Sequence, residues 1–174
     1  EATVREVRES GIVPDADVLL VPGGESTTIS RLVHREGIAP EIRAHVAAGK
    51  PVLATCAGLI LASRDAGDER VETLDLLDVA VERNAFGRQK DSFEAPLSVA
   101  GLDDPFPVVF IRAPAIAEVG ERVDVLATWA DRPVAVREGP VLGTAFHPEL
   151  TADARIHDLA FFPEARPRAR SDPR

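Results

Sequence analysis

Short apolar runs, each closed by a turn rich in glycine or proline, organise this chain. Residues 17–22, 52–54 and 141–146 are such runs, with several β-branched members and no polar alternation. Uninterrupted runs of this length are typical of strands buried on both faces of a parallel sheet. Residues 27–35 and 41–48 lie between the first two runs and predict helices. Strands alternating with helices predict a three-layer α/β domain with a mainly parallel sheet.

A second pattern begins after residue 94. Apolar and polar residues alternate there, which is typical of antiparallel strands with one exposed face. We predict an antiparallel extension around residues 95–137, with strands at 95–100 and 107–111 and a hairpin of 123–130 with 133–137.

The remaining segments fill in the domain. Residues 76–81 predict another strand, and residues 151–162 predict a last helix. Residues 65–73 are polar and predict a surface loop. Residues 82–94 combine polar groups with Gly87 and two arginines, which suits a loop that handles an anionic group. The tail, residues 163–174, is rich in Pro and Arg and predicts disorder.

Composition narrows the possible functions. The 174 residues are 45% hydrophobic and carry a net charge of −9, which favours a globular domain and argues against a nucleic-acid-binding surface. Eighteen of the 20 basic residues are Arg, so the acidic, Lys-poor composition predicts a halophilic source. The single cysteine excludes an internal disulfide, and no signal peptide or apolar run of spanning length is seen. We therefore expect a cytoplasmic protein without membrane contact.

That cysteine lies at a turn suited to catalysis. Cys56 follows a predicted buried strand and precedes a predicted helix that runs to about residue 64, with Gly58 two residues on. Nucleophiles occupy such strand-to-helix turns, where the helix N-terminus favours a thiolate. A lone buried cysteine that packs as a small apolar residue is the alternative.

Two further turns are predicted at the same edge of the sheet. His147 and Glu149 follow the strand at 141–146; two residues apart in an extended segment, they would face the same side, so Glu149 could orient the histidine. Gly23 and Gly24 allow close backbone approach to an oxyanion, and Ser26 or Thr27 would cap the next helix. Alternatively, His147 is a hydrogen-bonded loop histidine and Glu149 a surface charge.

The other histidines and the spacing of metal-binding residue types suggest no second site. We predict that His34 and His45 lie on the surface and that His157 is structural. No metal-ligand spacing appears, and Gly23-Gly24 is not followed by the lysine of a phosphate-binding loop. No metal and no cofactor are expected.

Five stretches of the sequence carry a more specific signal: LVPGGESTT (20–28), ATCAGLI (54–60), VERNAFGRQKDSFE (81–94), FIRAP (110–114) and FHPELT (146–151). Together they resemble the PdxT/SNO family of class I glutamine amidotransferases, the glutaminase subunits of pyridoxal 5′-phosphate synthase. The resemblance covers roughly residues 17–160. It implies a flavodoxin-like fold and hydrolysis of L-glutamine to L-glutamate and ammonia. The ammonia would pass to a synthase subunit of the PdxS/SNZ type in a hetero-oligomer.

Carried over by position, the resemblance implies a Cys56–His147–Glu149 triad. It also implies oxyanion contacts from the backbone of Gly24 and Ala57. The residues implied to hold glutamine are Gly24, Glu25, Ser26, Arg83, Ile111 and Arg112. Arginines suit the α-carboxylate of an amino acid, and Glu25 suits its ammonium group.

The chain departs from the family pattern at both ends. The family begins with a strand and helix that have no counterpart here, so we predict an N-terminally truncated amidotransferase domain over residues 1–162. Two alternatives remain at this point. The chain could be another class I amidotransferase or related cysteine hydrolase with a different acceptor, or a catalytically impaired fragment that only binds the synthase.

Overall fold

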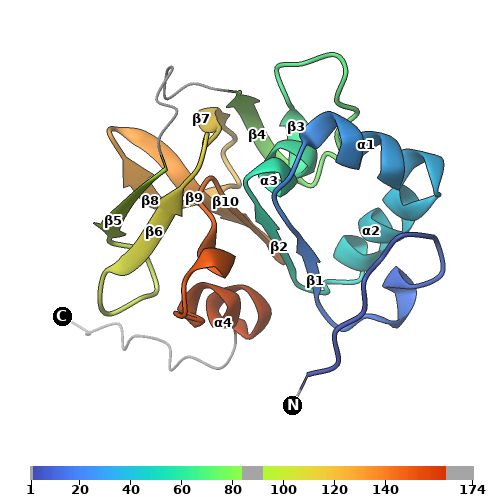
Figure 1. Cartoon of the computed structure of the whole chain (residues 1–174), viewed down its shortest axis with the longest axis horizontal. Coiled ribbons are helices and arrows are strands. Elements are labelled where there is room, and N and C mark those ends of the chain that lie inside the picture. Colours follow the sequence, from blue (N-terminus) through green and yellow to red (C-terminus); the bar gives the residue numbers. More distant parts are fainter. Residues whose placement is uncertain (1, 84–91, 164–174) are drawn as a thin grey trace.

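The main sheet is mixed and has five strands, in the order β1-β2-β10-β9-β8 (Figure 1). This computed structural model describes residues 2–83 and 92–163. Strands β1, β2 and β10 are parallel, whereas β9 and β8 are antiparallel; their bounds are Leu19–Val21, Val52–Thr55, Val141–Thr144, Arg132–Glu138 and Asp124–Trp129. The three predicted runs therefore form the parallel part, with their carboxyl ends at one edge. The run 17–22 is not buried on both faces as predicted, because Leu20 of β1 is 39% exposed.

Strand β2 lies at the centre of a three-layer arrangement. All four of its residues are buried, and it contacts both α3 (Ala57–Ala62) and α4 (Arg155–Phe161). A strand buried on both faces needs apolar side chains throughout, which is why residues 52–54 lack polar alternation. Helices α1 (Ser26–Arg35) and α2 (Ile38–Ala47) lie beyond β1 (Figure 1).

The antiparallel extension is confirmed, but it is divided between sheets. β5 (Phe93–Leu97) pairs with β6 (Phe106–Phe110), and the β8–β9 hairpin joins the main sheet. β7 (Ala115–Val119), which the sequence did not predict, pairs with β4 (Leu77–Glu82). β3 (Ser63–Asp65) completes that third sheet and shortens the helix predicted to run to residue 64.

Three helix starts differ from the predictions. Glu25, not Ser26 or Thr27, caps α1, because its carboxylate accepts the backbone N–H groups of Thr27 and Thr28. Helix α2 begins at residue 38 rather than 41, with Pro40 inside its first turn, where an N–H needs no helical partner. The last helix, α4, begins at residue 155 rather than 151.

Residues 66–76 form an irregular loop, as predicted, but this loop is anchored. Val71 and Leu74 are buried, and Glu72 exchanges two hydrogen bonds of 2.9 Å with the Ser30 hydroxyl of α1. The Arg43 side chain of α2 donates to the Leu74 carbonyl at 3.1 Å. These contacts fix the loop between the two helices and β4.

The surface prediction for His45 is wrong. This residue is only 4% exposed, and its Nε2 lies 3.1 Å from the Pro51 carbonyl oxygen. The pattern misled because a histidine that satisfies a backbone carbonyl can lie on the apolar face of a helix. His34 is also partly buried and contacts the Glu72 carbonyl, while His157 lies half-buried beside the Phe161 ring.

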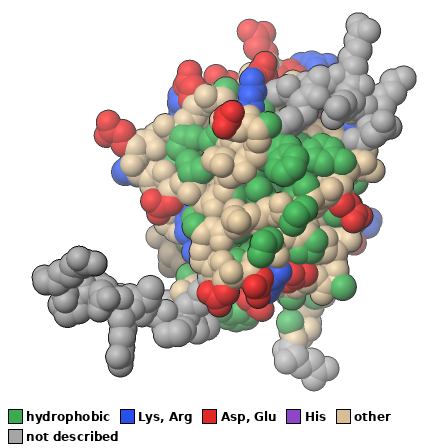
Figure 2. Space-filling model, turned by 90° about the vertical axis from the view of Figure 1, so that its left-hand side faces the viewer, with side chains coloured by type: hydrophobic (Ala, Val, Ile, Leu, Met, Phe, Trp, Pro, Cys, Tyr) green, Lys and Arg blue, Asp and Glu red, His purple; other side chains and the backbone are tan. Residues whose placement is uncertain are grey.

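Acidic side chains lie around the edge of the face that carries β5, β6 and β8, and apolar side chains gather at its centre (Figure 2). Phe93, Phe110 and Trp129 stack against one another from these strands, with ring centroids 4.9–6.0 Å apart. In the described ranges, no helix is long and apolar enough to cross a bilayer.

Candidate active site

Three turns meet at the carboxyl ends of β1, β2 and β10. Gly23 follows β1, Cys56 follows β2 and His147 follows β10. A Cβ atom placed on Gly23 would lie 2.6 Å from Cε1 of His147 and 3.5 Å from Cβ of Cys56. The glycine therefore gives the histidine and cysteine room to approach the same point, and only glycine fits there without displacing His147.

Cys56 occupies a strained turn. Its φ of 51° and ψ of −106° are rare for a residue with a side chain, and its N–H donates to the Thr144 carbonyl at 2.8 Å. A Cβ on Gly58 would lie 2.0 Å from the Val21 carbonyl oxygen, so α3 packs directly on the backbone of β1. The turn presents a half-buried thiol at the sheet edge, the geometry of a nucleophile elbow.

His147 lies between a sulfur and a carboxylate. Its Nδ1 is 2.7 Å from Oε1 of Glu149, and its side chain is 13% exposed. Hydrogen bonds with Cys56 and then Glu149 raise the pKa of His147 to about 10. Since Nδ1 faces Glu149, Nε2 is the nitrogen left to exchange a proton with Cys56.

The contact between His147 and Glu149 has a different origin from the predicted one. Residues 148–150 form the 3₁₀-helix η2 (Pro148–Leu150) and are not extended. This turn folds the Glu149 carboxylate back to the imidazole of the residue that precedes η2. Burial raises the pKa of Glu149, but the hydrogen bonds from His147 and the backbone outweigh it and leave the pKa below its usual value.

Glu25 and Arg83 lie together at the other side of Gly23-Gly24. The Glu25 carboxylate accepts hydrogen bonds from the hydroxyls and backbone N–H groups of Thr27 and Thr28, which lower its pKa to about 2. Nη2 of Arg83 lies 3.8 Å from Oε1 of Glu25, beyond hydrogen-bond distance. The two groups thus form a loose pair of opposite charges at the end of β4 and the start of α1.

Three more predicted site residues lie on the same turns. Gly24 has a φ of +143°, and Ala57 begins α3, so its N–H has no acceptor within that helix. Ser26 is 2% exposed, and its hydroxyl has no hydrogen-bond partner among the residues that the structure describes.

Ile111 and Arg112 reach the site from β6. The N–H of His147 donates to the Val109 carbonyl at 2.9 Å, which places the end of β6 beside the histidine. Ile111 is 37% exposed, and Arg112 is exposed with a φ of 44°. Across the described ranges, Arg112 forms no hydrogen bond or ion pair with another residue.

Part of the predicted site cannot be placed. Residues 84–91 of the loop predicted to handle an anionic group lie outside the described residues, as do residues 164–174 of the tail. Within residues 2–83 and 92–163, no group of three or more His, Cys, Asp or Glu side chains is arranged to hold a metal ion.

A family model described as the SNO glutamine amidotransferase family matches residues 2–164. The chain belongs to this family. A member from Haloarcula marismortui, named pyridoxal 5′-phosphate synthase subunit PdxT, is 74% identical over 161 residues, which span 92% of this chain and 82% of the relative. A member of the same name from Halobacterium salinarum is 72% identical over 161 residues, with shares of 92% and 79%. Both genera are halophilic, in line with the prediction from composition.

Solved structures agree with the family assignment. A crystal structure of a glutamine amidotransferase superimposes with a TM-score of 0.84 at 46% identity, covering 90% of this chain and 83% of that one. The structure of PurLQS from Thermotoga maritima shares only the fold, with a TM-score of 0.63 at 18% identity and shares of 85% and 76%. The predicted flavodoxin-like class I amidotransferase fold is confirmed.

One charged residue beside the site of this amidotransferase domain, Asp68, was not predicted from the sequence. Asp68, from the loop 66–76, contacts Nη1 of Arg83. The sequence offers only an indirect signal, since a half-buried arginine needs a carboxylate and the segment 65–69 is acidic. Nothing in the spacing indicates which of these carboxylates reaches Arg83.

Proposed function

We propose that this chain hydrolyses L-glutamine to L-glutamate and ammonia as the glutaminase subunit of pyridoxal 5′-phosphate synthase. The ammonia passes to a synthase subunit of the PdxS/SNZ type. The observation that carries the proposal is the grouping of Cys56, His147 and Glu149 at one sheet edge: Cys56 and His147 face the same point beside Gly23, and the imidazole is hydrogen-bonded to Glu149. It occurs in a family whose halophilic members are named PdxT subunits of that synthase.

The first half-reaction forms a thioester. The Cys56 thiol gives its proton to Nε2 of His147, the sulfur attacks the side-chain amide carbon of glutamine, and the carbonyl π electrons move to oxygen. The backbone N–H groups of Gly24 and Ala57 hold this oxyanion, a role worth about 3 kcal/mol per donor. His147 gives its proton to the amide nitrogen, the C–N bond breaks, and ammonia leaves.

The second half-reaction uses water. His147, now neutral, takes a proton from a water molecule that attacks the thioester carbon, and the C–S bond breaks to release glutamate. Glu149 holds the imidazole through Nδ1 in both halves, so Nε2 faces the reacting atoms each time.

Charge complementarity supports an amino acid substrate. Arg83 and Arg112 suit the α-carboxylate, and Glu25 suits the α-ammonium group. Ile111 contributes an exposed apolar surface for the substrate methylenes.

Glutamate release tests the proposal. We would measure it in high salt for the wild type and for Cys56→Ala, with and without the cognate synthase subunit. The expected result is release by the wild type that rises when the synthase is added and is absent from Cys56→Ala. Thr55→Ala is a matched control, because it alters the neighbouring buried residue without removing the thiol.

Two results would contradict the proposal. If glutamate release were the same with and without the synthase, the result would favour an amidotransferase or cysteine hydrolase with another acceptor. Co-elution with the synthase without any release would favour a chain that only binds it.

A further inference from the structure

Asp68 holds the centre of a chain of four charged side chains. Its carboxylate accepts hydrogen bonds from the backbone N–H and Nε of Arg70 at 3.0 Å and from Nη2 of Arg70 at 2.7 Å. The same carboxylate contacts Nη1 of Arg83, whose Nη2 points toward Glu25 at 3.8 Å. The side chain of Asp68 is only 13% exposed, so water screens these contacts less than at the surface.

The backbone brings Asp68 to this place. Gly67 has a φ of +61°, its N–H donates to Oδ1 of Asp65 at 2.8 Å, and a Cβ there would lie 3.0 Å from the Val81 carbonyl oxygen. The loop thus turns tightly against β4, two residues before Arg83. The N–H of Val71 donates to the Asp68 carbonyl at 3.0 Å, and buried Val71 holds the loop from the other side.

The contrast between the two contacts of Arg83 is informative. Its Nη1 is bound to Asp68, whereas its Nη2 is held out of hydrogen-bond reach of Glu25. An arginine released from Asp68 would close on Glu25 and form a direct ion pair. In that ion pair, the charges of Arg83 and Glu25 would neutralise each other. Neither side chain would then be free to bind the carboxylate or the ammonium group of an amino acid.

We propose that Asp68 is a positioning residue that holds Arg83 apart from Glu25, so that the two can bind the α-carboxylate and α-ammonium groups of glutamine. Arg70 in turn fixes the Asp68 carboxylate through its three donors. Asp68 does not touch the reacting amide. The inference rests on the proposed function, because it takes glutamine as the ligand.

The test compares Asp68→Asn with Glu69→Gln. Both variants remove one negative charge from the same loop, but exposed Glu69 forms no ion pair with Arg83 in the described part of the chain. In the complex with the synthase, we expect Asp68→Asn to raise KM for glutamine about 10-fold with kcat nearly unchanged, and Glu69→Gln to leave both as in the wild type. Calorimetric binding of glutamine to the same variants in a Cys56→Ala background should show the same loss of affinity.

A double-mutant cycle separates positioning from folding. In an Arg83→Ala background, Asp68→Asn should raise KM no further, because there is no guanidinium left to position. Hydrolysis of butanamide, which lacks both the α-carboxylate and the α-ammonium group, should be equally slow with and without the Asp68→Asn substitution in either background. Unfolding temperatures of all variants identify any that fail to fold.

The outcomes are distinguishable. Glutaminase activity with an unchanged KM in Asp68→Asn would overturn the positioning role and leave the proposed function intact. An equal loss for glutamine and butanamide would also overturn it, since that result means a general structural defect. A wild type that neither binds nor hydrolyses glutamine would overturn both proposals.

Discussion

A histidine from another element lies near each end of strand β2, and the two histidines have opposite pKa shifts. At the amino end, His45 is buried against the Pro51 carbonyl, and burial is the main cause that lowers its pKa. At the carboxyl end, hydrogen bonds with Cys56 and Glu149 raise the pKa of His147 to about 10. Burial lowers the pKa of both, so the partners decide the outcome.

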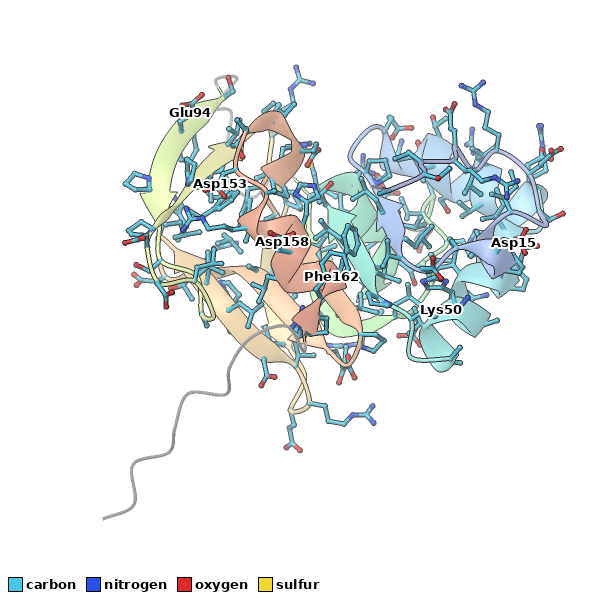
Figure 3. All side chains as sticks on the ribbon, turned by 90° about the horizontal axis from the view of Figure 1, so that it is seen from below. Asp15, Lys50, Glu94, Asp153, Asp158 and Phe162 are labelled. Carbon is cyan, nitrogen blue, oxygen red and sulfur yellow. The ribbon has the colours of Figure 1, made fainter. Side chains whose placement is uncertain are left out.

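The same contrast extends to the neighbouring groups. At the amino end, the ammonium group of Lys50 donates to the carbonyls of Pro14 and Ala16, at 3.2 and 2.9 Å, and Lys50 lies near Asp15 (Figure 3). Those contacts satisfy backbone groups and close the end of the sheet. The carboxyl end instead gathers a thiol, an imidazole and carboxylates around glycine turns, and so keeps charge in a half-buried place.

Replacing Gly58 with alanine should cause the largest effect. The new Cβ would lie 2.0 Å from the Val21 carbonyl oxygen, so β1 and α3 must separate. We expect a loss of about 3 kcal/mol or more in the free energy of unfolding, measured by urea denaturation in high salt. Gly49→Ala is the control at the amino end, where a Cβ meets nothing within 4 Å and only its φ of +75° is strained. Equal losses for both variants would remove the contrast between the two ends.

Replacing Gly23 with alanine should damage catalysis more than stability. The Cβ would displace the His147 ring, since it would lie 2.6 Å from Cε1. We expect kcat/KM for glutamine to fall about 100-fold, the usual effect of moving a catalytic group by an ångström. The unfolding temperature should change little. Wild-type turnover in this variant would show that the His147 ring can accommodate the new Cβ without leaving its working position.

Removing the His147 imidazole should change how stability depends on pH. The folded-state pKa of His147, about 10, lies above its unfolded value near 6.5. Its contribution is therefore fully present below about pH 6.5 and is lost as pH rises toward 10. The stability difference between wild type and His147→Gln should shrink between pH 6 and pH 9 in thermal unfolding scans. A difference that grows over this range would contradict the raised pKa.

Replacing His45 should have a smaller effect with the opposite sign. Its folded-state pKa is lowered, so the wild type should lose stability as pH falls below about 6.5. In His45→Gln, the amide can still donate to Pro51, and this acid loss should diminish; the packing cost at pH 8 should be about 1 kcal/mol. His34→Gln, on the neighbouring helix, is the control. If His45→Gln lost as much stability at acid pH as the wild type, that result would contradict the lowered pKa of His45.

Much of the fold follows from local patterns. Two of the buried runs become β2 and β10, because a strand covered on both faces tolerates only apolar side chains; the third becomes β1, in which Leu20 is exposed. The strand β7 was missed because Pro114 and short alanines obscure its pattern, and its pairing with β4 is a long-range contact. The cap of α1 was assigned to Ser26 or Thr27, yet the Glu25 carboxylate caps the helix and accepts four hydrogen bonds from Thr27 and Thr28.

In the candidate site, too, some residues follow from local sequence and others depend on tertiary contacts. The turns at Cys56 and His147 could be predicted, because the carboxyl ends of parallel strands meet at one edge. Asp68 could not, since it reaches Arg83 through loop contacts that depend on Ser30 and on the backbone of β4. Local sequence identifies the groups at strand ends, whereas the groups that orient them depend on tertiary packing.

The 174 residues contain one cysteine and no methionine, so Cys56 holds the only sulfur atom of the sequence. A thiol reagent or an oxidant that reacts with sulfur therefore has a single target in this sequence, and that target is the candidate nucleophile. The stoichiometry of alkylation therefore measures the fraction of chains with a reactive Cys56 directly, because the sequence has no second thiol. For the same reason, an oxidant that reacts with sulfur modifies the candidate nucleophile, because the sequence contains no other sulfur atom to react in its place.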